Sequence, residues 1–357
     1  MASMNEESTP VVRRETKNSI SVDFEGKLTF KERLIQKLKE ANTWITAGVN
    51  VLKFILMLGV SFVILYPFLA RIANSFMTQA DVLDATVSLV PKNPTLEIYQ
   101  AIIFENNYFE GFINTLLLSL MCAVIQMMVS CLVGYGLAKF KFKGNSIVMI
   151  AVIVTMVIPH SALQTSIMKH FASFDLATVL SWQYPGIIEL VTGDALDLTF
   201  TFWPLFILSI GGLAFKNGLY IYLMRQFFKG VPDELEESAY VDGSGVFRTF
   251  FQIILPLAVP MMITIFLFSF SWQWTDEFYH SLFFYTDDPQ FKVILMPDMY
   301  TQMPPSLIPP NGYGAKTLYY NIVQNTAGML IIAPLIIMYL FCQRYLVEGI
   351  ERSGIVG

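Results

Sequence analysis

Six long stretches of the chain carry no charged residue and consist largely of apolar side chains. They cover residues 54–70, 111–138, 144–168, 198–215, 249–275 and 317–343. A helix that crosses a bilayer needs about 20 apolar residues, so each stretch is long enough to cross once. A membrane β-barrel would instead show segments of about 10 residues with alternating polarity. The pattern predicts an all-α polytopic membrane protein with six transmembrane helices.

The composition agrees with this prediction. Of the 357 residues, 14% are charged and 54% are hydrophobic, whereas a soluble domain carries about 25% charged residues. The net charge of -5 gives no reason to expect a nucleic-acid partner. The three cysteines lie in apolar stretches and the three histidines have no ligand spacing, so we expect neither disulfides nor a metal site.

Lysine and arginine are distributed unevenly among the segments that join the apolar stretches. If the N-terminus is inside, 17 of the 23 basic residues lie on the cytoplasmic side, where they are normally retained. Five lie outside, and Lys216 lies within the fourth span if that span runs on to Arg225. We therefore expect both termini in the cytoplasm. The outer segment 276–316 contains six prolines, which predicts an ordered or semi-extended loop without helices.

The chain divides into three parts by charge and hydropathy. Residues 1–50 form a cytoplasmic N-terminal segment, 51–345 a six-span domain, and 346–357 a cytoplasmic tail. Residues 1–40 have no apolar core or cleavage site typical of a signal peptide. The pattern over 28–46 predicts an interfacial amphipathic helix, and a plain charged lead-in that sets topology is an equal alternative.

Two kinds of residue pattern that would allow the chain to power transport by itself are missing from the sequence. The six apolar stretches contain no aspartate or glutamate, whereas ion-coupled carriers usually need ionisable groups in the membrane. The chain also lacks the phosphate-binding pattern G-x-x-x-x-G-K-[ST] of ATPases. These features predict that the chain is no enzyme and that energy comes from another polypeptide.

The loop 231–256 (VPDELEESAYVDGSGVFRTFFQIILP) has strong helix signals. Pro232 suits a first helical turn, and the acidic residues after it lie at the positive end of the helix dipole. Gly243 supplies the positive φ that ends a helix. A second short helix is predicted from Ser244 onward, before Pro256 opens the next span.

In this loop the sequence resembles the permease subunits of bacterial ABC importers, in particular the carbohydrate-type branch. That family has a Glu-Ala-Ala…Gly…Ile-x-Leu-Pro signature here. The matching residues are Glu237, Ser238, Ala239, Gly243, Ile253, Leu255 and Pro256. Ser238 replaces the first alanine, which is a change between small residues. Similar strings occur before the second span, in the next loop and at the C-terminus, so the resemblance covers about residues 50–357.

The resemblance implies that the loop is a coupling helix that docks onto a separate ATPase. The residues implied in coupling are Glu234, Glu237, Ser238, Ala239, Asp242, Gly243, Leu255 and Pro256. It also implies a plasma-membrane location, a second permease in a heterodimeric pore, an extracytoplasmic solute-binding protein and a sugar substrate. ATP would be bound by partner subunits, so no cofactor is expected in this chain. The alternatives are a permease for a peptide or amino acid, and a channel or membrane scaffold.

Polar and aromatic residues within the apolar stretches are candidates for the substrate path. They are Asn114, Gln126, Gln164, Lys216, Ser271 and Trp274. Hydrogen bonds between helices and an interfacial aromatic belt are the alternative explanations. Lys216 lies between Gly211-Gly212 and Asn217-Gly218, which could break a helix where it lines a cavity. It could then bind an acidic or phosphorylated group, or it could snorkel or form a structural pair.

Overall fold

The computed structural model describes residues 41–175, 187–286, 288, 292–308 and 313–352. Within these ranges the regular structure is helical, and extended backbone pairs only in an isolated bridge between Phe174 and Leu196. The all-α prediction is confirmed. The chain separates into two units, residues 1–69 and 70–357, and each is described by itself.

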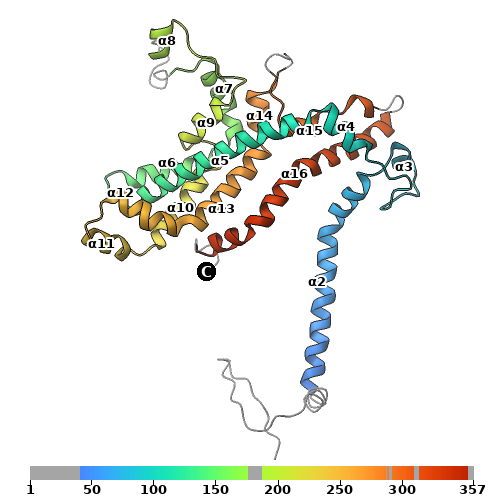
Figure 1. Cartoon of the computed structure of the whole chain (residues 1–357), viewed down its shortest axis with the longest axis horizontal. Coiled ribbons are helices and arrows are strands. Elements are labelled where there is room, and N and C mark those ends of the chain that lie inside the picture. Colours follow the sequence, from blue (N-terminus) through green and yellow to red (C-terminus); the bar gives the residue numbers. More distant parts are fainter. Residues whose placement is uncertain (1–40, 176–186, 287, 289–291, 309–312, 353–357) are drawn as a thin grey trace, which may run out of the picture. The chain divides into compact units, whose positions relative to one another are not determined.

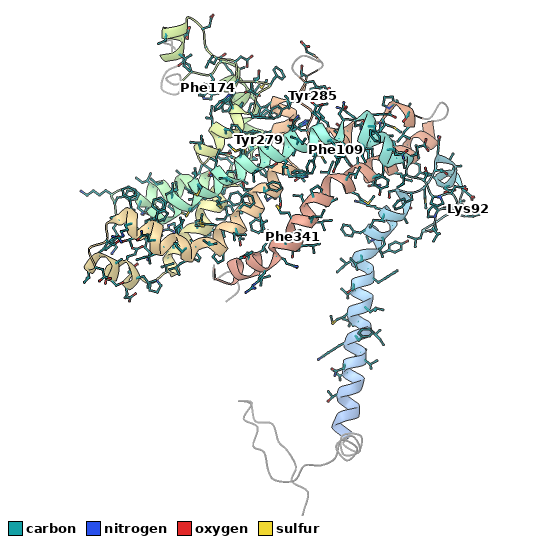
Figure 2. The ribbon with its side chains drawn as sticks, in the orientation of Figure 1. Lys92, Phe109, Phe174, Tyr279, Tyr285 and Phe341 are labelled. Atoms are coloured by element: carbon teal, nitrogen blue, oxygen red, sulfur yellow. The ribbon has the colours of Figure 1, made fainter. Side chains whose placement is uncertain are left out.

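Helix α2 (Ala41–Asn74) contains the first predicted span (Figure 1). Its part from Gly48 to Asn74 is 27 residues long and apolar enough to cross a bilayer. Large apolar side chains are exposed all along the part within the first unit (Figure 2), and a helix that is apolar all round needs an apolar environment. Residues 28–40 of the predicted amphipathic helix lie outside the described residues.

The centre of the second unit consists of four long helices. These are α5 (Tyr108–Lys139), α10 (Asn217–Gly230), α13 (Leu255–Trp274) and α16 (Tyr313–Arg352). Helices α10 and α13 pack against α5, and α16 packs against α13 (Figure 1). One buried cluster includes Trp274 and joins α5, α13 and α16; another includes Met224 and joins α5, α10 and α13. Helix α5 therefore takes part in both clusters.

Two glycines allow neighbouring helices to approach closely. A Cβ atom at Gly134 of α5 would lie 2.6 Å from the Cβ of Met224 on α10. A Cβ atom at Gly218 of α10 would lie 2.5 Å from Oγ1 of Thr155 on α6 (Asn145–Val157). Small residues are favoured at such contacts because helices in lipid associate largely through close packing.

The third predicted span is bent. Helix α6 ends at Val157, and η1 (His160–Leu163) and α7 (Gln164–Ala172) follow at an angle of 95° to it. Ile158 has an extended backbone with ψ of 118°, as expected for a residue that precedes proline. Pro159 therefore accounts for the break.

The fourth predicted span is also broken. The stretch 198–215 contains only the eight-residue α9 (Trp203–Ile210), and after a bend the chain continues as α10. Four helices of the described part are long and apolar enough to cross a bilayer alone, or five if α6 and its bent continuation cross together. A sixth crossing, as predicted from the sequence, would require α9 and α10 to cross together as one broken helix.

The predicted second short helix of the loop 231–256 is not separate from the fifth span. Helix α12 (Val246–Thr249) passes through a π-helical turn, η2 (Phe250–Ile254), directly into α13. Its N-cap is Gly245 rather than Ser244. The π-turn lies just before Pro256, which lacks the N–H for an α-helical bond. The loop therefore contains one separate helix, α11 (Glu234–Val241).

Short helices lie at the end of the second unit opposite α11 (Figure 1). They include α3 (Gln79–Leu83), α4 (Glu97–Glu105), α14 (Phe278–Phe283), α15 (Met296–Thr301) and η3 (Pro305–Leu307). The prediction that segment 276–316 lacks helices is wrong. Pro297 and Pro305 lie in the first turns of α15 and η3, where a missing N–H costs no hydrogen bond.

The close approach of α5 and α10 can be tested with Gly134→Ala. The added Cβ would overlap Met224, and overpacking of this kind costs about 1–3 kcal/mol. We expect a lower unfolding temperature for the purified protein in detergent. Gly136→Ala is the matched control, because nothing lies within 4 Å of the Cβ position at Gly136. Equal unfolding temperatures for the two variants would contradict the packing described here.

Candidate functional site

Helix α11 presents acidic side chains at one end of the second unit. Its first turn contains Glu234, Glu236 and Glu237, which is favourable because the N-terminus of a helix is electropositive. Glu236 is buried, whereas Glu234 and Glu237 are exposed. Neither exposed glutamate forms an ion pair with another described residue. The exposed face of α11 therefore carries uncompensated negative charge.

The turn after α11 depends on Gly243. This glycine has a φ of 81°, as the sequence predicts. Its N–H donates to the carbonyl of Tyr240 (3.0 Å), and the N–H of Ser244 donates to the carbonyl of Ala239 (2.9 Å). This pair of bonds is the Schellman arrangement that closes a helix C-terminus. The turn thereby fixes the direction in which the chain leaves α11.

An ion pair anchors the start of α11 to the end of α5. Lys139 donates hydrogen bonds to the Val231 carbonyl (2.6 Å) and to the Asp233 carboxylate (2.5 Å). The lysine side chain is buried and the aspartate is exposed. The ammonium beside Asp233 holds the pKa of that carboxyl below its usual value. A movement of α11 can therefore pass directly to α5.

The other predicted coupling residues have different environments. Ser238 and Asp242 are exposed, and Ala239 is buried under α11. Leu255 and Pro256 belong to the first turn of α13, after the π-turn that α11 contacts. The loop also exposes large apolar side chains. Examples are Val241 (87% exposed) and Phe247 (80% exposed). This mixture of acidic and apolar groups is suited to docking a protein partner.

A buried polar bridge joins three helices near the middle of α5. The amide of Gln126 donates to the hydroxyl of Ser209 on α9 (3.2 Å) and accepts from the hydroxyl of Ser269 on α13 (2.7 Å). All three side chains are buried. In this conformation both polar ends of Gln126 are therefore engaged in bonds between helices.

The bridge lies next to the break between α9 and α10. Gly212 and Lys216 both have positive φ, 70° and 63°, and Lys216 is the residue that directly precedes α10. Its side chain is exposed, with Nζ 5.0 Å from the ring centroid of Phe215 and 5.3 Å from that of Trp272. The predicted break between Gly211 and Gly218 is thus present, and it positions a cation over two aromatic rings.

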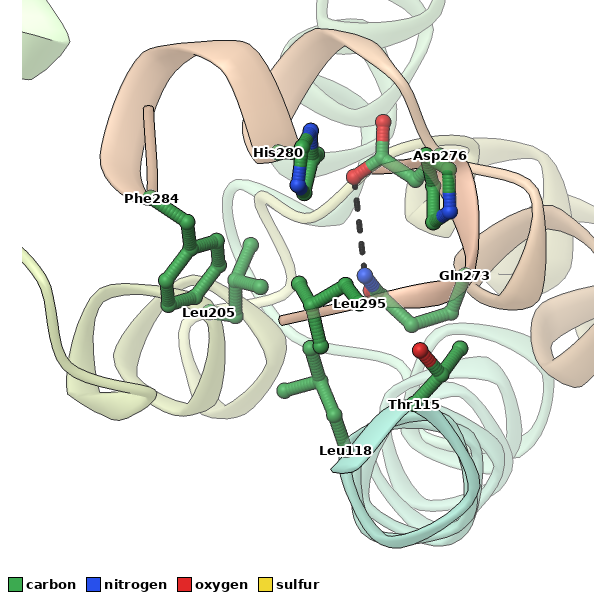
Figure 3. A pocket seen from close by; sticks show the side chains of 9 residues that line it. Thr115, Leu118, Leu205, Gln273, Asp276, His280, Phe284 and Leu295 are labelled. Atoms are coloured by element: carbon green, nitrogen blue, oxygen red, sulfur yellow. Dashed lines mark hydrogen bonds between the residues drawn. The ribbon is translucent and has the colours of Figure 1, made fainter. Parts of the chain in front are cut away.

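Two small cavities adjoin Gln273 and Asp276 at the end of α13. One is about 10 Å³, room for about one water molecule, and Thr115 and His280 also line it (Figure 3). Gln273 donates to Asp276 (3.5 Å), and the backbone N–H groups of Phe278 and Tyr279 donate to the same carboxylate. Burial raises the pKa of Asp276, which lies beyond α13, to about 6.

The second cavity is too narrow to hold a water molecule and lies between the polar bridge and the aromatic rings beside the break. Its lining consists of Gln126, Phe215, Ser269, Trp272, Gln273 and Asp276. Trp272 is 47% exposed, so the rings at this cavity are accessible from outside the unit. In the structure, Gln126 and the two aromatic partners of Lys216 therefore line the same narrow cavity.

The remaining candidates for the substrate path do not line this narrow cavity. Trp274 is fully buried and donates to the carbonyl of Ile331 (2.8 Å), so its assignment to a path is corrected to a role in the core. Asn114 donates to the carbonyl of Ile294. Gln164 is exposed at the start of α7, and Ser271 is partly exposed on α13.

Residues 126–352 match the family described as "Binding-protein-dependent transport system inner membrane component". The matched region contains the whole loop 231–256 and both broken helices. The chain belongs to this family. It is therefore a multi-pass membrane component of a transport system that depends on a binding protein.

Several permeases of this family are similar over nearly their whole length. The chain is 28% identical to the probable starch degradation products transport system permease AmyC of Thermoanaerobacterium thermosulfurigenes. The match covers 86% of this chain and 98% of that protein. It is 27% identical to the maltodextrin permease MalD of Streptococcus pneumoniae (85% and 94%) and 26% identical to the galactooligosaccharide permease GanQ of Bacillus subtilis (85% and 94%).

A solved structure shares the fold of this permease. It is a bacterial ABC transporter involved in the import of the acidic polysaccharide alginate, and it matches with a TM-score of 0.61 at 19% identity, covering 86% of this chain and 98% of that chain. At this identity the match supports the fold alone.

Sequence reasoning missed several residues of the candidate site. Lys139 was only one of the 17 basic residues counted on the cytoplasmic side, and Trp272 was not among the candidates for the substrate path. Phe215 and Ser209 gave no signal, because a phenylalanine or serine in an apolar stretch is ordinary. Only the packing of α9 and α13 against α5 shows that these residues meet.

The polar bridge can be tested with Gln126→Leu. This change keeps the size of the side chain but leaves the Ser209 and Ser269 hydroxyls unpaired, and each buried unpaired group costs about 1–3 kcal/mol. We expect a lower unfolding temperature in detergent. Gln343→Leu is the control, because Gln343 is exposed and donates only to the nearby Leu340 carbonyl. If both variants unfold like the original protein, the bridge does not stabilise the fold.

Proposed function

We propose that this chain is a permease subunit of an ATP-driven importer and forms half of a translocation pore for a sugar or oligosaccharide. The observation that carries the proposal is the separate helix α11, with exposed Glu234 and Glu237 and a tight turn at Gly243. Helix α11 is tied to α5 through Lys139. Such a helix can receive a push from a partner and pass it to the membrane helices.

The substrate class is supported by the named relatives. Three permeases that align over 94–98% of their own length are named for starch degradation products, maltodextrin and galactooligosaccharides. Their substrates are all carbohydrates but differ in sugar and linkage. The comparison therefore supports a saccharide as the transported class without selecting one.

The partners follow from this assignment. An ATPase subunit would bind and hydrolyse ATP and dock on α11, where acidic residues suit a basic groove. A second, different permease would complete the pore, and an extracytoplasmic binding protein would deliver the saccharide. Helix α11 and both termini would then be cytoplasmic, and α14 and α15 would lie on the opposite side.

The docking assignment can be tested with Glu237→Lys. Charge reversal on the exposed face of α11 should remove most of the co-purifying ATPase subunit, because like charges across an interface repel. The measurement is the ratio of ATPase subunit to tagged permease after purification. Glu110→Lys is the control, since Glu110 is exposed at the start of α5 away from the loop. An unchanged ratio in Glu237→Lys would contradict docking at α11.

The turn can be tested separately with Gly243→Asp. A side chain at a φ of 81° is strained, so the direction of the chain after α11 should change. We expect normal membrane insertion and continued ATP hydrolysis, but uptake of radiolabelled saccharide reduced at least about tenfold. Gly230→Ala, at a position with open space and ordinary φ, should transport normally. Normal uptake by Gly243→Asp would contradict the coupling role.

A further inference from the structure

The break between α9 and α10 presents a cation together with aromatic rings. The Lys216 ammonium lies over the rings of Phe215 and Trp272, whose centroids are 5.3 Å apart. Lys216 forms no ion pair with another residue that the structure describes. Both Lys216 and Trp272 are exposed. Their charge and ring surface are therefore available to a molecule outside this chain.

Hydrogen-bonding groups lie beside these rings. The narrow cavity next to Phe215 and Trp272, which has no room for a water molecule, is also lined by Gln126, Ser269, Gln273 and Asp276. An aromatic face and neighbouring amide and carboxylate groups are the chemistry that a sugar ring needs, since its C–H face stacks and its hydroxyls form hydrogen bonds. Lys216 adds a charge that a neutral sugar does not need.

The backbone around Lys216 also favours a negative charge. Lys216 precedes the 14-residue helix α10, whose N-terminus is electropositive. Asn217, the first residue of α10, is fully buried, and neither its amide nitrogen nor its amide oxygen has a partner among the described residues. A buried amide without partners is costly, so the packing beside Gly212 leaves hydrogen-bonding capacity unused inside the protein.

A structural role explains these features less well. A lysine that serves only to reach the interface needs no particular backbone conformation, whereas Lys216 has a positive φ at the break between α9 and α10. An aromatic belt would not require the left-handed backbone of Lys216, which carries strain in a non-glycine residue. Strain of this kind is typical of functional positions.

We propose that Lys216, Trp272 and Phe215 form a binding site for a saccharide with an anionic group, either a carboxylate or a phosphate. The sugar ring stacks on the exposed Trp272, and Lys216 pairs with the anionic group. This inference deepens the proposed importer function and rests on it for the saccharide class.

Binding can be measured by calorimetry on the purified transporter complex in lipid nanodiscs, without binding protein or ATP. The three probes are trigalacturonate, glucose 6-phosphate and neutral maltotriose. We expect at least one anionic probe to bind about tenfold or more tightly than maltotriose, because a charge-assisted contact is worth about 1.5–3 kcal/mol. Preference for trigalacturonate indicates a carboxylate ligand, and preference for glucose 6-phosphate indicates a phosphate ligand.

Variants then assign the preference to these residues. Lys216→Gln should lose it, Lys216→Arg should keep it, and Lys229→Gln, an exposed lysine at the other end of α10, should leave it unchanged. Trp272→Ala should weaken the binding of all three probes alike. Trp203→Ala, at another exposed tryptophan, should leave their binding unchanged. Equal binding of the three probes, no binding by the original protein, or a preserved preference in Lys216→Gln would overturn the proposal.

The importer function is examined in the same preparation by a different measurement. Saccharide-stimulated ATP hydrolysis after addition of the binding protein reports on transport and does not depend on the anionic preference. Stimulated hydrolysis without anionic preference would overturn only the binding site. Absence of stimulation together with a Lys216-dependent preference would overturn only the importer assignment.

Discussion

A peptide group inside a bilayer has no water with which to form hydrogen bonds, and this constraint determines most of the structure. It explains why the apolar stretches are helical. It also explains why the breaks near Pro159 and Gly212 lie next to other helices rather than on a solitary helix. At the second break, the N–H groups of Leu213 and Ala214 donate to the carbonyl of Leu208. The irregular backbone is thereby satisfied within the protein.

Helix α5 is the element on which these features converge. At one end Lys139 holds the start of α11, near the middle Gln126 joins α9 and α13, and Gly134 allows α10 to approach. The loop 231–256 and the polar bridge are thus connected by one rigid helix of 32 residues. A displacement of α11 would reach the break and the rings beside it through α5, since a packed helix moves largely as a unit.

Much of the fold and of the loop could be predicted from residue patterns. The apolar stretches indicated the helices, and Gly243 indicated the turn, because only a residue without Cβ adopts positive φ without cost. The helices of segment 276–316 were not predicted, because prolines were taken to exclude helix although first-turn prolines do not. Trp274 was predicted to lie on the substrate path because an interfacial tryptophan and a core tryptophan cannot be told apart from the sequence.

The sequence by itself determined the membrane environment, the family and the acidic loop, since these depend on hydropathy and local backbone preference. The tertiary structure decided which side chains meet. It placed Trp272 rather than Trp274 beside Lys216, paired Lys139 with Asp233, and placed Gln126 between two serines from distant segments. These outcomes depend on how α9, α10 and α13 pack against α5. Such packing joins residues about 80–140 positions apart, a separation at which local sequence patterns carry no signal.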